Sequence, residues 1–148
     1  MRVTTVGHGT RPAAELVACL EAAGVETLAA AGIAYRHAVE LGGRRSGEPG
    51  ADRFACIATP GFRSYAAWMG TSAWQEALAG ALAEPGPCLM CAETLPWRCH
   101  RWLIAELLLA RGYEVLHLFR PGDARRHRLS DDSEVRAGRL YLCGELVA

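Results

Sequence analysis

The chain has 148 residues, of which 51% are hydrophobic, and its 16 acidic and 16 basic side chains give a formal net charge of zero. This length and hydrophobic content suit one globular domain. The zero net charge disfavours functions that depend on bulk attraction to nucleic acid or anionic lipid. No apolar run approaches the roughly 20 residues that a membrane-spanning helix needs, so we expect no membrane partner.

The first residues predict a strand, a turn and a helix. Residues 2–6 are rich in β-branched side chains and predict a short strand, which Gly7-His8-Gly9-Thr10 follows as a turn. A helix then begins at Pro12 and ends at Gly24. This start does not resemble a signal peptide, so we expect the six cysteines to lie in a reducing, cytoplasmic compartment.

The middle of the chain predicts a further strand and two helices. Residues 25–28 begin a second strand but run directly into residues 29–32, which resemble the end of a helix without its beginning. Residues 33–41 predict a strand, and residues 42–60, rich in Gly, Arg and Pro, predict a long loop. The helical pattern of residues 64–83 is divided near Gly70, which predicts two short helices.

The last part of the chain sets the predicted fold class. Residues 88–91 predict a buried strand, residues 102–111 a helix ended by Gly112, and residues 113–119 a strand that the right-handed crossover rule makes parallel to the first. Residues 120–148 are charged at first and β-like at 139–143. We therefore predict one α/β domain over residues 1–148, with three layers and a mainly parallel sheet flanked by helices.

Two cysteines belong to the predicted strand at residues 88–91, and their environments differ. We interpret Cys88 as a core residue, because free cysteine packs as a small hydrophobe. Cys91 ends the strand just before a helix N-terminus, whose partial positive charge favours a thiolate. The sequence indicates no residue with which Cys19, Cys56 or Cys143 would form a site. Cys91 is therefore the candidate reactive thiol.

Polar side chains gather after Cys91, at the carboxyl end of the predicted strand, where α/β proteins place their sites. Cys99 and His100 could face the same pocket as Cys91, and Glu93 could orient them. Arg98 and Arg101, together with the free amides of the helix start, predict a seat for phosphate or carboxylate, although a solvated helix end with salt bridges explains them almost equally well. His8 follows the first strand, and it faces Cys91 if the two strands are neighbours. Its interpretation as a general base and as a turn histidine bonded to backbone both stay open.

These segments resemble a bacterial and archaeal family catalogued as domain of unknown function 488. The matching pieces are Thr5-Val-Gly-His8-Gly-Thr, Gly32-Ile-Ala-Tyr35-Arg-His37, Leu41-Gly-Gly-Arg44, Gly61-Phe62-Arg-Ser-Tyr65-Ala-Ala-Trp-Met69 and Leu89-Met-Cys91-Ala-Glu93 with Pro96, Arg98, Cys99-His100-Arg101 and Leu103-Ile104-Ala105. The resemblance implies a compact α/β domain without an established reaction. It also adds Thr10, Tyr35 and Arg44 to the candidate ligand-binding residues.

The chain departs from this family at one junction. Members typically carry a segment reading roughly Asp-Val-Arg, then Pro, then Ser-Arg and Phe, before the helix that leads into the Gly-Ile-x-Tyr strand. Here Leu28 passes directly to Ala29. Either the protein has lost part of its site or the segment is missing from the sequence as printed, and the truncated helix at Ala29 favours the second explanation.

The leading functional hypothesis is an enzyme or a ligand-binding domain for a small anionic molecule, with nucleotides among the candidates. Its catalytic residues would be His8, Cys91, Glu93, Cys99 and His100, and its anion clamp Arg98 and Arg101. One alternative is a metal ion held by Cys91, Cys99 and His100. Another is a non-catalytic interaction or nucleic-acid-associated domain that uses the Arg-rich residues 120–128. The sequence predicts no particular substrate or oligomeric state.

Overall fold

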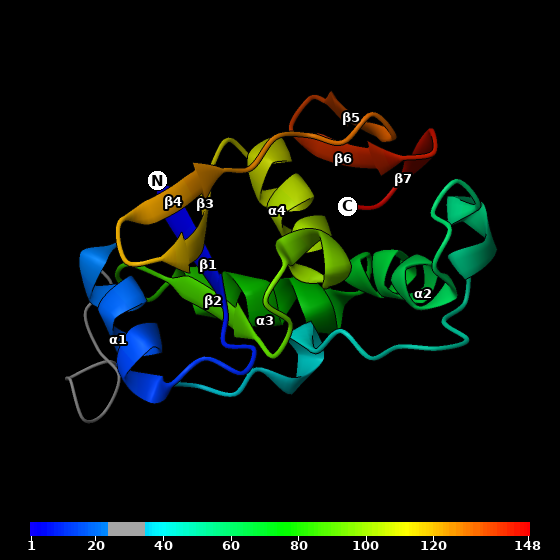
Figure 1. Ribbon diagram of the computed structural model, residues 1–148. Helices are drawn as coiled ribbons and strands as arrows, with labels where there is room; N and C mark the ends of the chain where they lie inside the picture. Colours follow the sequence, from blue (N-terminus) through cyan, green and yellow to red (C-terminus); the bar gives the residue numbers. More distant parts are fainter. Residues whose placement is uncertain (24–34) are drawn as a thin grey trace.

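The computed structural model describes residues 1–23 and 35–148, and a four-stranded sheet forms its centre (Figure 1). The strand order is β2 (Cys88–Cys91), β1 (Arg2–Gly7), β3 (Glu114–Arg120) and β4 (Asp123–Arg126). β1 is parallel to both β2 and β3, whereas β4 is antiparallel to β3. The predicted parallel relationship between the strands on either side of the 102–111 helix is confirmed.

Helices α1 (Ala13–Ala22) and α4 (Arg101–Ala110) cover opposite faces of this sheet. Side chains of a strand alternate between its two faces. Val6 and Leu118 therefore pack with Leu20 of α1, whereas Val3 and Val115 belong to the main core together with the leucines of α4. The predicted helices after Pro12 and after Cys99 are confirmed, and the sheet lies between them.

The main core also contains α2 (Pro60–Met69) and α3 (Ser72–Leu82), which confirm the two short helices predicted over residues 64–83. The helices separate at Gly70, and the side-chain oxygen of Thr71 caps α3 by accepting a hydrogen bond from the Trp74 amide. Thr is among the residues that favour this position because its hydroxyl satisfies a free amide of the first turn.

The strand predicted over residues 33–41 is wrong for the part that the structure describes. Residues 35–38 have no regular structure, and Val39–Leu41 form the 3₁₀ helix η1. Two side chains of α2 bind its carbonyl groups: Trp68 Nε1 donates to the Glu40 oxygen at 2.7 Å, and the Tyr65 hydroxyl donates to the Leu41 oxygen at 2.8 Å. The Glu40 and Leu41 carbonyl groups therefore have hydrogen-bond donors without the neighbouring strand that a β-strand here would need.

The predicted single three-layer domain with one mainly parallel sheet is also wrong. The residues after β4 form a separate antiparallel sheet of β5 (Ser133–Arg136), β6 (Arg139–Leu142) and β7 (Glu145–Leu146). The strand predicted at residues 139–143 therefore exists, but it belongs to this second sheet. Leu140 and Leu142 are buried in the main core, so α4 packs between the two sheets (Figure 1).

A disulfide joins Cys56 to Cys143, with 5.6 Å between their Cα atoms. The sequence pattern left both cysteines without a partner, and this interpretation is wrong. The two residues are 87 positions apart, so the pairing depends on the second sheet reaching the segment after η2 (Ala51–Phe54). The disulfide ties the end of the chain to its middle.

The strand predicted over residues 25–28, the helix end at residues 29–32 and the Leu28–Ala29 junction lie outside the described residues. Within the described part of the chain, no helix combines the length and the hydropathy needed to cross a bilayer.

Candidate functional site

The end of β2 meets the end of β1 at one edge of the central sheet. Gly7 pairs with Cys91, and the backbone pairing continues beyond both strands: the His8 amide donates to the Cys91 oxygen at 3.0 Å, and the Gly9 amide to the Ala92 oxygen at 2.9 Å. The two strands are thus neighbours, as the His8 hypothesis required. The His8 ring, however, binds the Gly9 carbonyl at 3.0 Å, which leaves the turn interpretation in place.

Arg101 lies behind this edge and holds the loop that follows β2. Its side chain is only 1% exposed. One terminal nitrogen donates to the Glu93 carbonyl at 2.6 Å and to the Thr94 carbonyl at 3.2 Å, and the other donates to the Thr5 hydroxyl at 3.4 Å. The Nε atom has no partner within the described part of the chain. Arg101 therefore positions the loop, and most of its guanidinium is already committed to the protein.

Gly7 allows the loop to pass so close. A Cβ atom at Gly7 would overlap the Glu93 carbonyl and the Arg101 guanidinium. Any other residue would force the loop or the arginine to move, because both neighbours are fixed by the hydrogen bonds just described. Glycine is therefore required at position 7, the end of β1, because there is no space for a side chain.

Cys91 and Cys99 influence each other's proton affinity, although seven residues separate them in the sequence. Cys91 is half-buried, and its sulfur also lies 3.5 Å from the Glu93 carbonyl. Cys99 is only 5% exposed, and its sulfur lies 3.3 Å from Nδ1 of His100. The 3₁₀ helix η3 (Pro96–Arg98) ends just before Cys99 and turns the chain back toward β2.

This arrangement separates the proton affinities of the two thiols. The hydrogen bond from Cys91, with further contributions from His100 and the Arg101 amide, lowers the pKa of Cys99 to about 3. The pKa of Cys91 is raised, because its proton is shared with Cys99 and because the site is partly buried. The two groups titrate as a pair, so the opposite shifts belong to the pair and not to either thiol alone.

Cys88 differs from this pair although it lies on the same strand. It packs beside the cluster of Val6, Leu20 and Leu118, but it is half-buried and also lines the cavity described below, so it is not a fully enclosed core residue. Burial raises its pKa to about 11, so it stays protonated near neutral pH. Cys88 is therefore a natural reference for the reactivity of Cys91.

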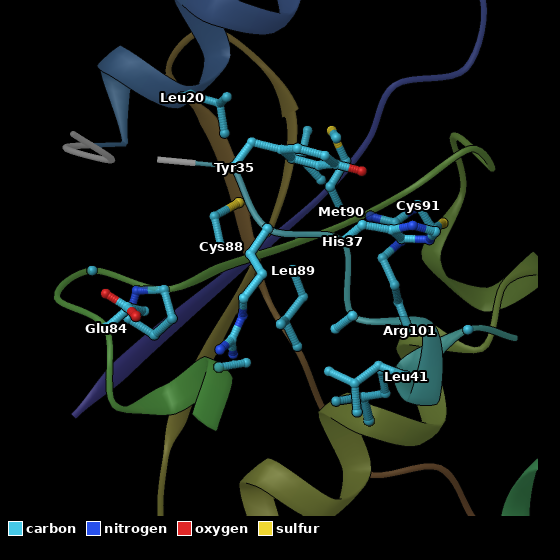
Figure 2. A pocket seen from close by; sticks show the side chains of 18 of the residues that line it. Leu20, Tyr35, His37, Leu41, Glu84, Cys88, Leu89, Met90, Cys91 and Arg101 are labelled. Carbon is cyan, nitrogen blue, oxygen red and sulfur yellow. The ribbon is translucent and has the colours of Figure 1, made fainter. Parts of the chain in front are cut away.

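A cavity of about 400 Å³ opens along β2. Residues 35–38, the end of α3 and the start of α4 form its other walls, and Figure 2 shows His37, Cys91 and Arg101 at one end with Glu84 toward the other. Glu84 is the one carboxylate among the lining residues that the structure describes. The polar residues that Figure 2 shows near Cys91 are His37 and Arg101, and His100 is a further polar lining residue.

The structure brings together some of the predicted site residues and separates others. Tyr35, Cys91, His100 and Arg101 line the cavity, and Cys99 lies behind Cys91. Thr10 lines a second hollow beside Phe119 and Arg120. The remaining predicted residues lie outside the lining of both hollows: His8, Arg44, Glu93 and Arg98, of which the last three are exposed.

Sequence reasoning missed three groups that surround the thiols. Arg36 and His37 line the cavity, and their signal was present, since both belong to the matched segment around Tyr35. Tyr65 is fully buried with its ring 5.1 Å from the His100 ring, and its hydroxyl accepts from Trp74 Nε1 at 3.0 Å. Helical spacing placed Tyr65 on a packed face, but it did not indicate that the Tyr65 ring contacts the ring of His100.

A buried polar chain extends from Arg101 to His127, which lies beside Glu106 in the middle of α4. The Thr5 hydroxyl lies 2.7 Å from His117 Nδ1, His117 Nε2 lies 3.0 Å from His127 Nδ1, and His127 Nε2 lies 3.5 Å from Glu106. Arginine can only donate, so Thr5 accepts from Arg101 and gives its own proton to His117. His117 then accepts at Nδ1 and donates from Nε2 to His127, whereas His127 Nε2 has no hydrogen-bond partner among the described residues.

The two alternative functions have weaker structural support. Within the described residues, no three His, Cys, Asp or Glu side chains are grouped to hold a metal ion. The Arg-rich residues 120–128 include β4, where Arg125 pairs with Asp123 and Arg126 with Glu114. Local acidic residues thus neutralise part of the charge that a nucleic-acid surface would need.

Comparison with known proteins gives one match. A family model described as "Domain of unknown function DUF488" matches residues 21–108, a range that contains the cavity wall from Tyr35 to Ile104 and both Cys91 and Cys99. No curated protein and no solved structure matches the chain.

Proposed function

The chain belongs to the DUF488 family, and from that premise we propose that it is a thiol-dependent enzyme acting on a small anionic molecule in the cavity along β2. The observation that carries the proposal is the position of Cys91, which lines the cavity together with His100 and Arg101. The family description assigns no activity, so the argument depends on the chemistry of these residues.

The two cysteines have complementary roles in the proposed reaction. Cys99 is buried beside His100 and carries the negative charge of the pair. Cys91 faces the cavity, and its sulfur becomes the nucleophile once its proton is lost to a base or to solvent. The charge of Cys99 raises the pKa of Cys91, and the Cys99 sulfur itself lies 3.3 Å from Nδ1 of His100.

The polar groups near Cys91 favour an anionic ligand. Arg101 contributes a buried positive charge, and its Nε atom has no partner within the described residues. His37 supplies a further polar group at the same end of the cavity, whereas Glu84 lies toward the other end (Figure 2). An anionic group is therefore best placed near Cys91, because charge-assisted hydrogen bonds are stronger than neutral ones.

Alkylation with two matched reagents tests this proposal. Iodoacetate is an anion and iodoacetamide is its neutral counterpart, so their relative rates at one cysteine report whether its surroundings favour negative charge. We expect Cys91 to prefer iodoacetate over iodoacetamide more strongly than Cys88 does, and inorganic phosphate at constant ionic strength to slow the iodoacetate reaction at Cys91. Site-resolved mass spectrometry gives the rate at each cysteine.

Two variants make the alkylation experiment specific. Cys88→Ser is the control and should leave the Cys91 rates unchanged, whereas Cys91→Ser should remove the phosphate-sensitive reaction. The proposal fails if Cys91 and Cys88 react at equal rates and neither prefers iodoacetate.

A further inference from the structure

The cavity along β2 lies at the outer edge of the central sheet. Because β2 is the outermost strand, side chains from both faces of the sheet reach the cavity: Cys88 packs with the cluster on the α1 side and Leu89 with the main core, and both line the wall. Aliphatic side chains of both clusters contribute to the wall: Val6, Leu20, Leu41, Leu89 and Ile104. These side chains offer a ligand no hydrogen bonds, so this part of the cavity favours an apolar group.

Two large hydrophobic side chains of the cavity wall are also open to solvent. Tyr35 is 63% exposed and Met90 is 37% exposed, and both line the cavity. Burial of apolar surface is favourable in proportion to the area removed from water. An apolar ligand that covers these two side chains therefore binds more tightly than a small ion that leaves them exposed.

The two ends of the cavity differ in charge. Arg101 is 1% exposed, and among the described residues no acidic side chain forms an ion pair with it. At the other end the charges offset each other: the Arg36 guanidinium lies against the last turn of α3, within 3.3 Å of where a Cβ atom at Gly80 would be, and Glu84 follows that turn. The Arg101 end therefore carries the positive charge that no carboxylate balances.

We propose that the ligand is a small amphipathic anion, with its acidic group beside Arg101 and Cys91 and its apolar body along β2 as far as Cys88. The inference rests on the proposed function, because it uses the same anion-binding end of the cavity and names the class of substrate. Cys88 and Cys91 are three positions apart, which is about 10 Å along a strand. Figure 2 shows Cys88 between Glu84 and Cys91, so a body of this length covers both thiols.

The two thiols that line the cavity provide the test. The full-length protein is alkylated with iodoacetamide, which is neutral, in the presence of straight-chain carboxylates from acetate to octanoate. Both cysteines fall in the tryptic peptide 64–98, and fragmentation of that peptide by mass spectrometry gives the rate at each. Octanoate should slow the labelling of Cys88 and Cys91 together, whereas inorganic phosphate should slow Cys91 alone.

Chain length and charge have separate expected effects. Each added CH₂ group should lower the concentration of carboxylate that halves the labelling rate by about fourfold, until the cavity is filled. 1-Octanol has the same chain without the charge and should protect about tenfold less well than octanoate, because it lacks the charge-assisted hydrogen bond. Octylamine, which is a cation, should protect least.

Two matched variants locate the apolar part of the site. Met90 and Val135 are exposed strand residues with nearly equal exposed fractions, 37% and 38%, but Val135 lies on β5, outside the cavity wall. Threonine suits a strand at both positions. Met90→Thr should weaken the effect of octanoate by about threefold and leave that of phosphate unchanged, whereas Val135→Thr should change neither. Equal effects of octanoate in the two variants would contradict the proposed path along β2.

The possible outcomes separate this inference from the proposed function. If octanoate protects no better than acetate while phosphate still slows Cys91, the amphipathic ligand is wrong and the proposed function stands. If 1-octanol protects as well as octanoate, the acidic group is wrong, and the anion-binding end of the cavity is wrong with it. If neither phosphate nor any carboxylate slows the labelling, both proposals are wrong. The wild-type measurements decide the matter even if Met90→Thr fails to fold.

Discussion

The backbone at Gly43 lies against the imidazole of His100, so closely that a Cβ atom at Gly43 would overlap the ring at Nδ1. This is the ring nitrogen that lies 3.3 Å from the Cys99 sulfur. The segment after η1 therefore fixes the orientation of the histidine that stabilises the Cys99 thiolate.

Replacing Gly43 by Ala should displace His100 from Cys99. Loss of this charge-assisted contact should raise the pKa of Cys99 by about 1–2 pH units, and titration of the ultraviolet absorbance of the thiolate measures it. Gly61→Ala is the control, because a methyl group there meets only the Arg45 carbonyl at 3.7 Å. An unchanged titration in Gly43→Ala would show that His100 does not hold the thiolate.

Arg101→Met should destabilise the fold much more than Arg98→Met. The first change leaves the carbonyl groups of Glu93 and Thr94 without their donor, which should cost about 2–4 kcal/mol of unfolding free energy. Arg98 is exposed and has no recorded partner in the described residues, so its replacement should cost less than about 0.5 kcal/mol. Urea denaturation compares the two variants, and equal midpoints would contradict the positioning role of Arg101.

His117 should make the stability depend on pH on the acid side. Burial, with the nearby charges of His127 and Arg101, lowers its pKa from 6.5 to about 4 in the folded protein. Between these values the unfolded chain binds the additional proton, so the stability that His117 contributes is complete above pH 6.5 and is lost as the pH falls toward 4.

The loss over this range should amount to about 3 kcal/mol, and urea denaturation at a series of pH values measures it. His117→Gln cannot bind the proton, so its stability curve should be flatter in the same window. A slope equal to that of the wild-type protein would mean that other groups cause the acid destabilisation.

Removal of the disulfide between Cys56 and Cys143 should destabilise the protein by about 2–5 kcal/mol, because the bond closes a long loop in the unfolded chain. Thermal unfolding of the Cys56→Ser/Cys143→Ser double variant, with and without a reductant, measures the effect. The reductant should lower the melting temperature of the wild-type protein and leave that of the double variant nearly unchanged. If the reductant did not change the melting temperature of the wild-type protein, the disulfide would not be stabilising.

The parallel part of the fold could be predicted from the sequence because local patterns determine it. The apolar run at β2, the helical spacing of α4 and the β-branched residues of β1 each identify an element without reference to the others. The strand predicted over residues 33–41 failed for the opposite reason. Its apolar residues fit a strand, but the indole of Trp68 and the hydroxyl of Tyr65 bind its carbonyl groups and hold η1 instead.

The second sheet was missed because its pattern is weak. β5 and β6 are four residues each, and β5 carries Glu134 and Arg136, which pair with each other at the surface. Alternating charged residues of this kind are also typical of an exposed, irregular chain end. The packing of the second sheet is evident only from the burial of Leu140 and Leu142 in the core.

The candidate site was predicted in part. The order of strand, loop and helix places Cys91, Cys99 and His100 together, and the structure does so. The function of Arg101 could not be derived from spacing, because its long side chain reaches back across the sheet edge to carbonyl groups that sequence patterns do not identify. The cavity wall at His37 depends on the path of residues 35–42, which was predicted as a strand.

The central position of β1 has a consequence for how the chain is made. Thr4 pairs with Cys88 on one side and with Leu116 on the other, so β1 leaves the ribosome before both of its sheet partners and meets the first of them only when residues 88–91 emerge. Pairings between residues so distant in sequence slow folding, because the entropic cost of closing the intervening loop comes before the stabilising contacts form. The nascent protein therefore carries its central strand unpaired through most of translation, and deletion of the first seven residues would remove the shared neighbour of two strands at once.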